Sequence, residues 1–342
     1  MEKVNFRNLK SPYIIAEIGG NHSANIDLAK KGIINAKKAG ANCVKFQMYR
    51  HSEIVHPRLK ILPHVKNIAK EKTQSERFKK LELSELDIIR LYKQAKKTKI
   101  DFATTPFSVE LVKFLQKYVS FFKVASGDLD FFPMIEEIAK YKKNIVISTG
   151  MSDLKKIKET LKILKKNNVV ILHCISSYPT ISSDLNLNSI DYLQKAFNIQ
   201  IGLSDHTKNN IGSIVAVGKG VKIFEKHFLP DAEVKKVGDY ELSLNPYEMK
   251  KYCSEINEAF SSLGKKEKRV FNCEKKFYAN LCRSIYFSNE IKKGSKITFK
   301  DLSFIRPFNL KGLKIKNYKK LIGKKAKKNF KKLELVKKNF IF

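Results

Sequence analysis

The sequence predicts an α/β fold: a (β/α)8 barrel of the TIM type, followed by a small β-rich domain. Short runs of β-branched and aromatic residues recur along the first part of the chain, and about eight of them meet the criteria for buried strands. Segments whose apolar residues recur at helical spacing separate most of these runs. Eight strand–helix units within about 250 residues is the size expected of such a barrel.

The predicted strands are short apolar runs. In chain order they cover residues 13–18, 43–48, 101–104, 121–125, 144–148, 169–174, 199–204 and 221–226. The clearest helices cover residues 26–40, which Gly40 is expected to end, and 152–164, which Ser152 is expected to cap. In the long interval between the second and third strands, roughly residues 51 to 80 are predicted to be an elaborated loop.

The pattern changes after Gly264, so the barrel is predicted to cover residues 1–264. The lysine-rich stretch 265–278 is predicted to be a linker. The remainder, 279–342, contains short strands broken by Gly and Pro, among them a candidate at 291–297. A domain of this size is marginally stable alone, and docking onto another subunit would relieve that.

The formal net charge of +35 raises the question of nucleic-acid binding. Only eight residues are arginine, the side chain that reads bases and phosphates through its bidentate fork, and the lysines are spread over most of the chain. A solvated lysine-rich surface therefore explains the charge better, and no nucleic-acid partner is predicted.

No membrane association is predicted, because the chain start lacks the long apolar stretch of a signal peptide and no later run is long enough to span a bilayer. The five cysteines include no Cys-x-x-Cys pair, and three of them lie in or beside apolar stretches, as small buried residues do. A reducing, cytoplasmic location is expected.

Polar residues gather where the predicted strands end. Because TIM-barrel active sites lie at the carboxyl ends of the strands, these side chains are expected to converge on one pocket. They are Glu17, Lys45, Gln47, Thr105, Lys123, Ser126, Asp128, Ser148, Ser176, Tyr178, Ser204, His206 and His227. The last two follow neighbouring strands and so would face one another, which makes them candidate metal ligands.

Lys45 and Lys123 lie within otherwise apolar strands, where an unpaired ammonium group is costly. They could form buried ion pairs with Glu17 or Asp128. Alternatively, with the neighbouring hydroxyls, they could bind a phosphate or a carboxylate. Glu225 and Lys226 are adjacent on a strand, so only one of them is expected to face the interior.

Several motifs resemble those of the sialic acid synthase family. In the barrel they are Ile15-Ala-Glu-Ile-Gly-Gly-Asn-His, Val44-Lys-Phe-Gln, Thr104-Thr-Pro-Phe-Ser, Phe122-Lys-Val-Ala-Ser-Gly-Asp, Ile147-Ser-Thr-Gly-Met, Gly202-Leu-Ser-Asp-His-Thr and Glu225-Lys-His-Phe. In the second domain, Arg283-Ser-Ile-Tyr, Ile291-Lys-Lys-Gly and Ile305-Arg-Pro resemble the antifreeze-like (SAF) domain that ends these enzymes.

The resemblance implies a transferase that condenses phosphoenolpyruvate and water with an open-chain N-acyl hexose, giving a nine-carbon keto acid and phosphate. It implies Glu17 as the catalytic acid–base group, and a divalent metal on His206 and His227, Mn²⁺ with Mg²⁺ or Co²⁺ possible. Phosphoenolpyruvate would bind Lys45, Thr105, Lys123, Ser126, Ser148, Ser176 and Ser204. The sugar would contact Gln47, Asp128, Tyr178, Asp239 and Arg306, the last from the other subunit of a domain-swapped homodimer.

Three departures from the family pattern affect the choice of sugar. Ser176 stands where the family usually has Asn, Asp128 replaces a longer Glu, and the loop at 235–239 keeps Gly-Asp but lacks its prolines. N-acetylmannosamine is therefore one candidate. A diacetamido-trideoxyhexose, as used in legionaminic or pseudaminic acid synthesis, is the alternative.

Two other classes are compatible with the barrel. A non-catalytic sugar- or phosphate-binding protein would not need Glu17 or a histidine pair. The second is a metal-dependent aldolase that uses pyruvate. The two pocket lysines suggest Schiff-base chemistry, but a Schiff-base enzyme would need no metal ligands. Both groups are present, which favours the synthase.

Overall fold

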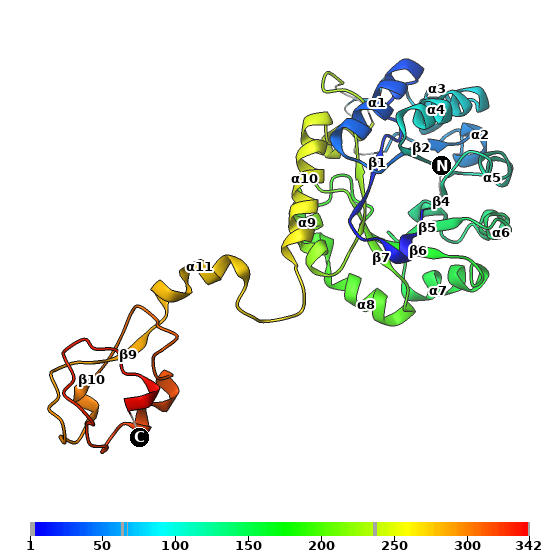
Figure 1. Ribbon diagram of the computed structural model, residues 1–342. Helices are drawn as coiled ribbons and strands as arrows, with labels where there is room; N and C mark the ends of the chain where they lie inside the picture. The colour runs from blue at the N-terminus through cyan, green and yellow to red at the C-terminus, as the bar shows by residue number, and fades with distance from the viewer. Residues whose placement is uncertain (1–3, 63–64, 67, 235–237, 341–342) are drawn as a thin grey trace. The chain divides into compact units, whose positions relative to one another are not determined.

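Eight parallel strands close into a barrel with the helices around it (Figure 1). The computed structural model describes residues 4–62, 65–66, 68–234 and 238–340. The chain divides into two compact units, Met1–Gly264 and Lys265–Phe342, and the barrel is the first of them. The predicted fold class is confirmed.

Each strand pairs with the next along the chain, and β8 pairs with β1 to close the ring. The strands are β1 (Tyr13–Glu17), β2 (Cys43–Met48), β3 (Asp101–Pro106), β4 (Phe121–Val124), β5 (Asn144–Ser148), β6 (Val169–Cys174), β7 (Ile201–Asp205) and β8 (Ile223–His227). All eight predicted strands are confirmed, with boundaries that differ by a residue or two.

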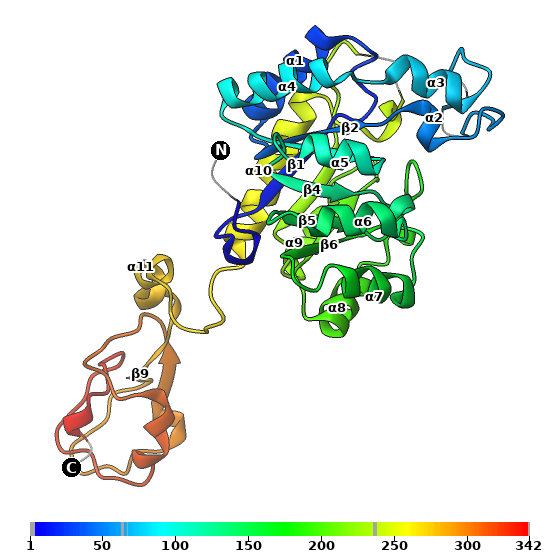
Figure 2. The same ribbon diagram turned by 90° about the vertical axis from the view of Figure 1, so that its right-hand side faces the viewer.

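The helices surround the strands, as the side view in Figure 2 shows. They are α1 (Ile26–Ala39), α2 (His51–Ile54), α3 (Gln74–Leu81), α4 (Glu85–Thr98), α5 (Val109–Leu115), α6 (Phe132–Ala139), α7 (Leu154–Ile163), α8 (Asn188–Phe197), α9 (Ile211–Gly218) and α10 (Pro246–Ser262). The predicted loop between the second and third strands contains α2 and α3.

Two helix ends test the predicted caps. Gly40 ends α1 at φ 98°, a left-handed conformation that favours glycine, so that prediction is confirmed. The prediction for Ser152 is wrong, because its hydroxyl donates to the Gly150 carbonyl. Asp153 caps α7 instead, accepting from the Lys156 amide at 2.8 Å.

Strand side chains alternate between two apolar layers. One face of β2 places Val44, Phe46 and Met48 in the large core that also contains helix residues. The opposite face contributes Cys43 to a smaller cluster with Ile223 and Phe6. Phe6, on the short helix η1 (Phe6–Asn8), is fully buried and packs edge-on against Tyr13 and Phe121. This cluster fills the barrel interior near the amino ends of the strands.

The second unit has its own small core and a two-stranded antiparallel sheet, β9 (Ser284–Phe287) and β10 (Leu302–Ile305). Helix α11 (Asn272–Leu281) occupies part of the segment predicted to be a linker. The predicted strand at 291–297 is not formed: a turn with Gly294 at φ 86° interrupts it, and only the isolated bridges of Ile291 and Lys296 remain.

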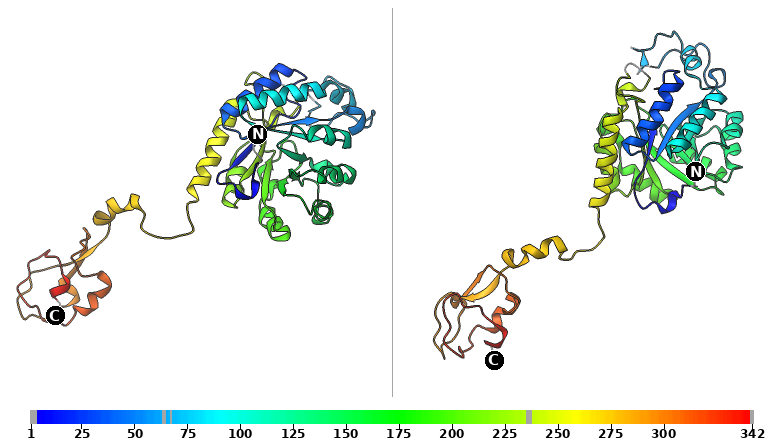
Figure 3. Two further views of the ribbon diagram at one scale, coloured as in Figure 1. Left: turned by 45° about the vertical axis from the view of Figure 1, so that its right-hand side comes forward. Right: turned by 45° about the horizontal axis from the view of Figure 1, so that its top comes forward.

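The two further views in Figure 3 show the ring of barrel helices from other sides. Among the helices of the described residues, none is both long and apolar enough to cross a bilayer.

Candidate active site

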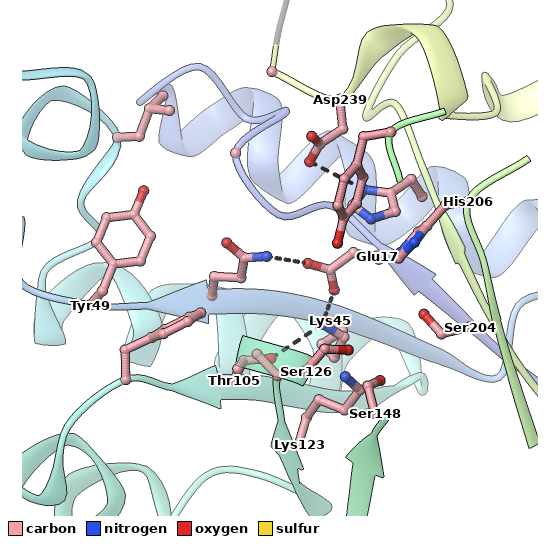
Figure 4. Close-up of a pocket in the computed structure, with 18 of the residues that line it drawn as sticks. Glu17, Lys45, Tyr49, Thr105, Lys123, Ser126, Ser148, Ser204, His206 and Asp239 are labelled. Carbon is pink, nitrogen blue, oxygen red and sulfur yellow. Dashed lines mark hydrogen bonds and ion pairs between the residues drawn. The ribbon is translucent and has the colours of Figure 1, made fainter. Parts of the chain in front are cut away.

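A cavity of about 290 Å³ opens at the carboxyl ends of the barrel strands (Figure 4). Most of the predicted site residues line it together. They are Glu17, Lys45, Gln47, Thr105, Lys123, Ser126, Ser148, Tyr178, Ser204, His206, His227 and Asp239. Residues 235–237, just before Asp239, lie outside the described part of the chain.

Two predicted residues of the barrel do not line this cavity. Ser176 lies close behind it, near enough to Gly150 that a Cβ there would meet the Ser176 hydroxyl at 2.2 Å. Asp128 follows Ser126 on a short 3-10 helix and is half-buried. Burial, and then repulsion by Asp130, raise its pKa to about 6. Arg306 belongs to the second unit.

A network of buried charges forms the floor of the cavity. Register places Glu17 beside Lys45, and the two form an ion pair. Lys45 Nζ also lies 3.6 Å from Glu225 Oε2, and Lys123 Nζ lies 3.5 Å from Glu225 Oε1. All four side chains are buried. Of the ion pairs considered from the sequence, the one between Lys45 and Glu17 is present. Lys123 pairs with Glu225 rather than with Asp128.

Glu225 holds the centre of this network, a role the sequence left undecided between Glu225 and Lys226. The two face opposite sides of β8: Glu225 lines the cavity, and Lys226 lies behind it, 3.2 Å from Asp205. Burial alone would raise the pKa of Glu225, but Lys123 and Lys45 outweigh it and lower that pKa to about 2. Glu225 is therefore a carboxylate at neutral pH.

Hydroxyl groups surround the two lysines. Thr105 lies 3.2 Å from Lys45 Nζ, and Ser204 donates to Glu225 at 2.9 Å. Ser126 accepts from the Gly150 amide at 3.1 Å. The buried Ser148 hydroxyl makes no hydrogen bond within the described part of the chain. These hydroxyls can donate hydrogen bonds to a bound anion, and Ser148 can do so without breaking an existing hydrogen bond.

His206 and His227 face one another with ring centroids 5.3 Å apart, and the Tyr178 ring lies 4.4 Å from that of His206. His206 Nδ1 lies 2.8 Å from the Ile175 carbonyl, which can only accept, so in the neutral imidazole Nδ1 carries the proton and Nε2 keeps its lone pair. His227 Nδ1 lies 3.3 Å from Asp239 Oδ2. The carbonyl at His206 orients that ring, as is usual for imidazoles that bind metals, whereas the contact of His227 with Asp239 lacks hydrogen-bond geometry.

The two imidazoles fit a divalent metal of the transition series. No third His, Cys, Asp or Glu of the described residues joins them in a metal-binding group. A metal bound here would keep most of its coordination positions open for substrate and water.

The outer wall of the cavity was not predicted. It comes from the residue after β2, the segment that leads to α3, helix α3 itself, and the start of the β3–α5 loop. The lining residues there are Tyr49, Leu62, Val65, Gln74, Arg77, Phe78, Leu81 and Phe107. One signal could have found them: the interval after the second strand is unusually long, and barrel sites are built from such loops.

The NeuB family model matches residues 32–268, well over half of the chain. The chain belongs to the NeuB family. The SAF domain model matches residues 283–341, in the second unit.

NeuB relatives of several kinds resemble the chain over nearly its full length. An N,N'-diacetyllegionaminic acid synthase of Campylobacter jejuni is 35% identical over 96% of this chain and 99% of the relative. A human N-acetylneuraminate-9-phosphate synthase is 33% identical over 92% and 88%. The crystal structure of an N-acetylneuraminic acid synthetase from Leptospira borgpetersenii covers 80% of this chain and 94% of its own, with 29% identity and a TM-score of 0.70.

These likenesses confirm the predicted family and the enzyme class, a transferase of the sialic acid synthase type. They span synthases of different nonulosonic acids, so the sugar is not resolved by them. The residues of the site bear on that choice.

Proposed function

We propose that this NeuB-family chain condenses phosphoenolpyruvate with an open-chain N-acyl hexose and water, giving a nine-carbon keto acid and inorganic phosphate. The observation that carries the proposal is that one cavity combines two groups of residues. Buried lysines and hydroxyls around Lys45 and Lys123 form its floor, and the facing pair His206 and His227 lies on one side.

Phosphoenolpyruvate would lie on the lysine side. Lys45 and Lys123 would contact its anionic groups, and Thr105, Ser126, Ser148 and Ser204 would add hydroxyl donors, with Ser176 close behind. The two lysines are already balanced by Glu17 and Glu225. A multiply charged anion would therefore be better neutralised with a further cation at His206 and His227.

Those two histidines would hold a divalent ion, Mn²⁺ or else Mg²⁺ or Co²⁺, which supplies Lewis-acid polarisation of the sugar aldehyde when bound. Tyr178 and Asp239, beside the histidines, and Gln47 would orient the sugar. Carbon 3 of phosphoenolpyruvate would then form a bond to the aldehyde carbon as the C=O π bond breaks. The aldehyde oxygen takes up a proton to become a hydroxyl, and carbon 2 is left electron-poor.

Water adds to carbon 2, and the bond from carbon 2 to the phosphate oxygen breaks to release phosphate. Glu17 would take a proton from that water. Its carboxylate is held in place on both sides, by Gln47 Nε2 at 3.1 Å and by the ion pair with Lys45.

The acceptor sugar has two candidates. N-acetylmannosamine is the first. A diacetamido-trideoxyhexose is the second, and the outer wall with Tyr49, Phe78 and Leu81 favours it, because the deoxy carbon and the methyl of the second acetamido group are apolar. The likeness to a diacetyllegionaminic acid synthase supports the same choice.

We also propose a domain-swapped homodimer in which Arg306 of the partner subunit contacts the sugar. Its support is the SAF domain that carries Arg306. A cytoplasmic location remains an expectation of the sequence.

The proposal is tested by phosphate release. The chain is incubated with phosphoenolpyruvate, Mn²⁺ and each candidate sugar, and inorganic phosphate and keto acid are both measured. Equal amounts of the two products are expected with at least one N-acyl sugar, and removal of the metal with a chelator should abolish them. No phosphate release with any N-acyl sugar would contradict the proposal.

A further inference from the structure

One face of helix α3 forms much of the cavity's outer wall. Gln74, Arg77, Phe78 and Leu81 are spaced as i, i+3, i+4 and i+7, which places them on the same side of the helix, and all four line the cavity. Two backbone contacts hold the start of α3: the Gln74 amide donates to Leu59, and the Thr73 hydroxyl accepts from Glu76.

Gln74 is the unusual member of this face. Its side chain is 3% exposed, and its Oε1 makes no hydrogen bond to any residue that the structure describes. A buried amide oxygen without a donor is unfavourable, and a ligand N–H in the cavity would remove that penalty. The atom is an acceptor, so it suits a neutral donor and repels a phosphate.

Tyr49 lies on the same wall. Its ring packs against Phe78 at 4.8 Å between centroids and against Phe107 at 5.9 Å. Among the described residues its hydroxyl has no hydrogen-bond partner, although the side chain is only 4% exposed. Burial raises the pKa of Tyr49 well above its usual value, so the hydroxyl stays protonated and can donate. Figure 4 shows Tyr49 across the cavity from His206.

The charged group on this face is already engaged. Arg77 lies 3.6 Å from Glu71, whose other oxygen is 3.1 Å from Lys80. What remains on this wall without a partner among the described residues is one acceptor and one donor, beside an apolar surface that includes Val65 and Leu81. That combination matches a single chemical group, a secondary amide with a methyl end.

We propose that Tyr49, Gln74 and Phe78 form a subsite for an acetamido group of the acceptor sugar, away from its aldehyde. The group's N–H would donate to Gln74 Oε1, its carbonyl would accept from the Tyr49 hydroxyl, and its methyl would pack against Phe78 and Leu81. This rests on the proposed synthase function and deepens it. The acceptor class it selects is a hexose with two acetamido groups.

The test compares two acceptors on three proteins. The value of kcat/KM is measured for a diacetamido-trideoxyhexose and for N-acetylmannosamine on the unaltered chain, on Gln74→Leu and on Gln200→Leu. Gln200 is the matched control: its Oε1 is also buried without a partner, but it lines a different cavity. Gln74→Leu should lower kcat/KM for the diacetamido sugar by about tenfold or more and leave N-acetylmannosamine within about twofold. Gln200→Leu should change neither.

A thermal melt separates a ligand role from a structural one. Because Gln74 Oε1 has no protein partner, Gln74→Leu should not lower Tm. Tyr49→Phe provides an independent variant with the same expected loss for the diacetamido sugar.

Phosphate release with the acceptor ratio unchanged in both variants would overturn the subsite alone. No phosphate release by the unaltered chain with any N-acyl sugar would overturn the synthase function, and the subsite with it.

Discussion

At the scale of single residues, Glu225 determines the electrostatics of the cavity. It lies within 3.6 Å of Lys45, within 3.5 Å of Lys123 and 2.9 Å from the Ser204 hydroxyl. Two buried ammonium groups therefore share one carboxylate, and Glu17 supplies the second negative charge. Removing one member of such a network leaves an uncompensated buried charge.

Glu225→Gln is expected to destabilise the barrel and nearly abolish turnover. Lys123 would lose its carboxylate partner, which costs about 3–5 kcal/mol for a buried pair. Thermal and urea unfolding measure the loss, and phosphate release measures turnover. Glu110→Gln is the control, because Glu110 pairs with Lys113 on an exposed helix face. Equal stability of the two variants would contradict this account.

Asp128 should make stability depend on pH in the direction opposite to most carboxyl groups. Its pKa is raised from 3.8 to about 6, so the folded state binds the proton more tightly than the unfolded state. The stabilisation is present below pH 3.8 and is lost as the pH rises to about 6. Asp128→Asn should remove this loss. At pH 7 the variant should have a free energy of unfolding about 1–3 kcal/mol larger than that of the unaltered chain, and a higher Tm. At pH 4 it should not be more stable. If the difference in Tm between Asp128→Asn and the unaltered chain is the same at pH 4 and pH 7, the raised pKa of Asp128 is refuted.

At the scale of elements, the outer wall depends on a short helix. Helix α3 is only 8 residues long, and its first turn relies on the Thr73 side chain, which accepts from the Glu76 amide at 3.2 Å. Fraying of that turn would displace Gln74 and Phe78 from the cavity without disturbing the strand-borne residues.

Thr73→Ala is therefore expected to raise KM for the sugar several-fold with little change in KM for phosphoenolpyruvate. The cap contributes about 1 kcal/mol. Ser84→Ala is the matched control: Ser84 caps the neighbouring helix α4, which contributes no residue to the cavity lining. The two variants should lose similar stability, and only Thr73→Ala should alter KM for the sugar. A matching change in Ser84→Ala would indicate a general loss of stability instead.

At the scale of the whole molecule, the barrel and the second unit each have a core of their own. The barrel holds the lysines, Glu17 and the histidines, and the second unit holds Arg306. The proposed homodimer can be tested because these groups lie in separate units.

Complementation tests the domain swap. Arg306→Ala and His206→Ala should each be inactive alone. Refolded together, they should form mixed dimers in which the barrel with an intact His206 receives Arg306 from the other subunit, and phosphate release should recover in part. Mixing each variant with itself is the control. No recovery in mixtures shown by size to contain dimers would argue against exchange of Arg306 between subunits.

The sequence by itself determined the barrel and most of the cavity floor. Strand and helix periodicities are local properties of the sequence, and the carboxyl ends of parallel strands meet at one face of a barrel. The sequence alone could therefore place Lys45, Lys123 and the two histidines together. Only the tertiary structure decided that Glu225 faces inward and Lys226 outward, because that depends on the register of β8 against β1 and β7.

The tertiary structure also decided the outer wall and the two displaced residues. Gln74 and Tyr49 meet the cavity through the packing of α3 onto the barrel mouth, which no local pattern encodes. Asp128 and Ser176 follow strands as predicted, yet the chain turns after each strand and sets them outside the cavity lining. The positions of strand ends are fixed by a repeating hydrogen-bond ladder, so they could be predicted from the sequence. The positions of loop side chains depend on long-range contacts, so they could not.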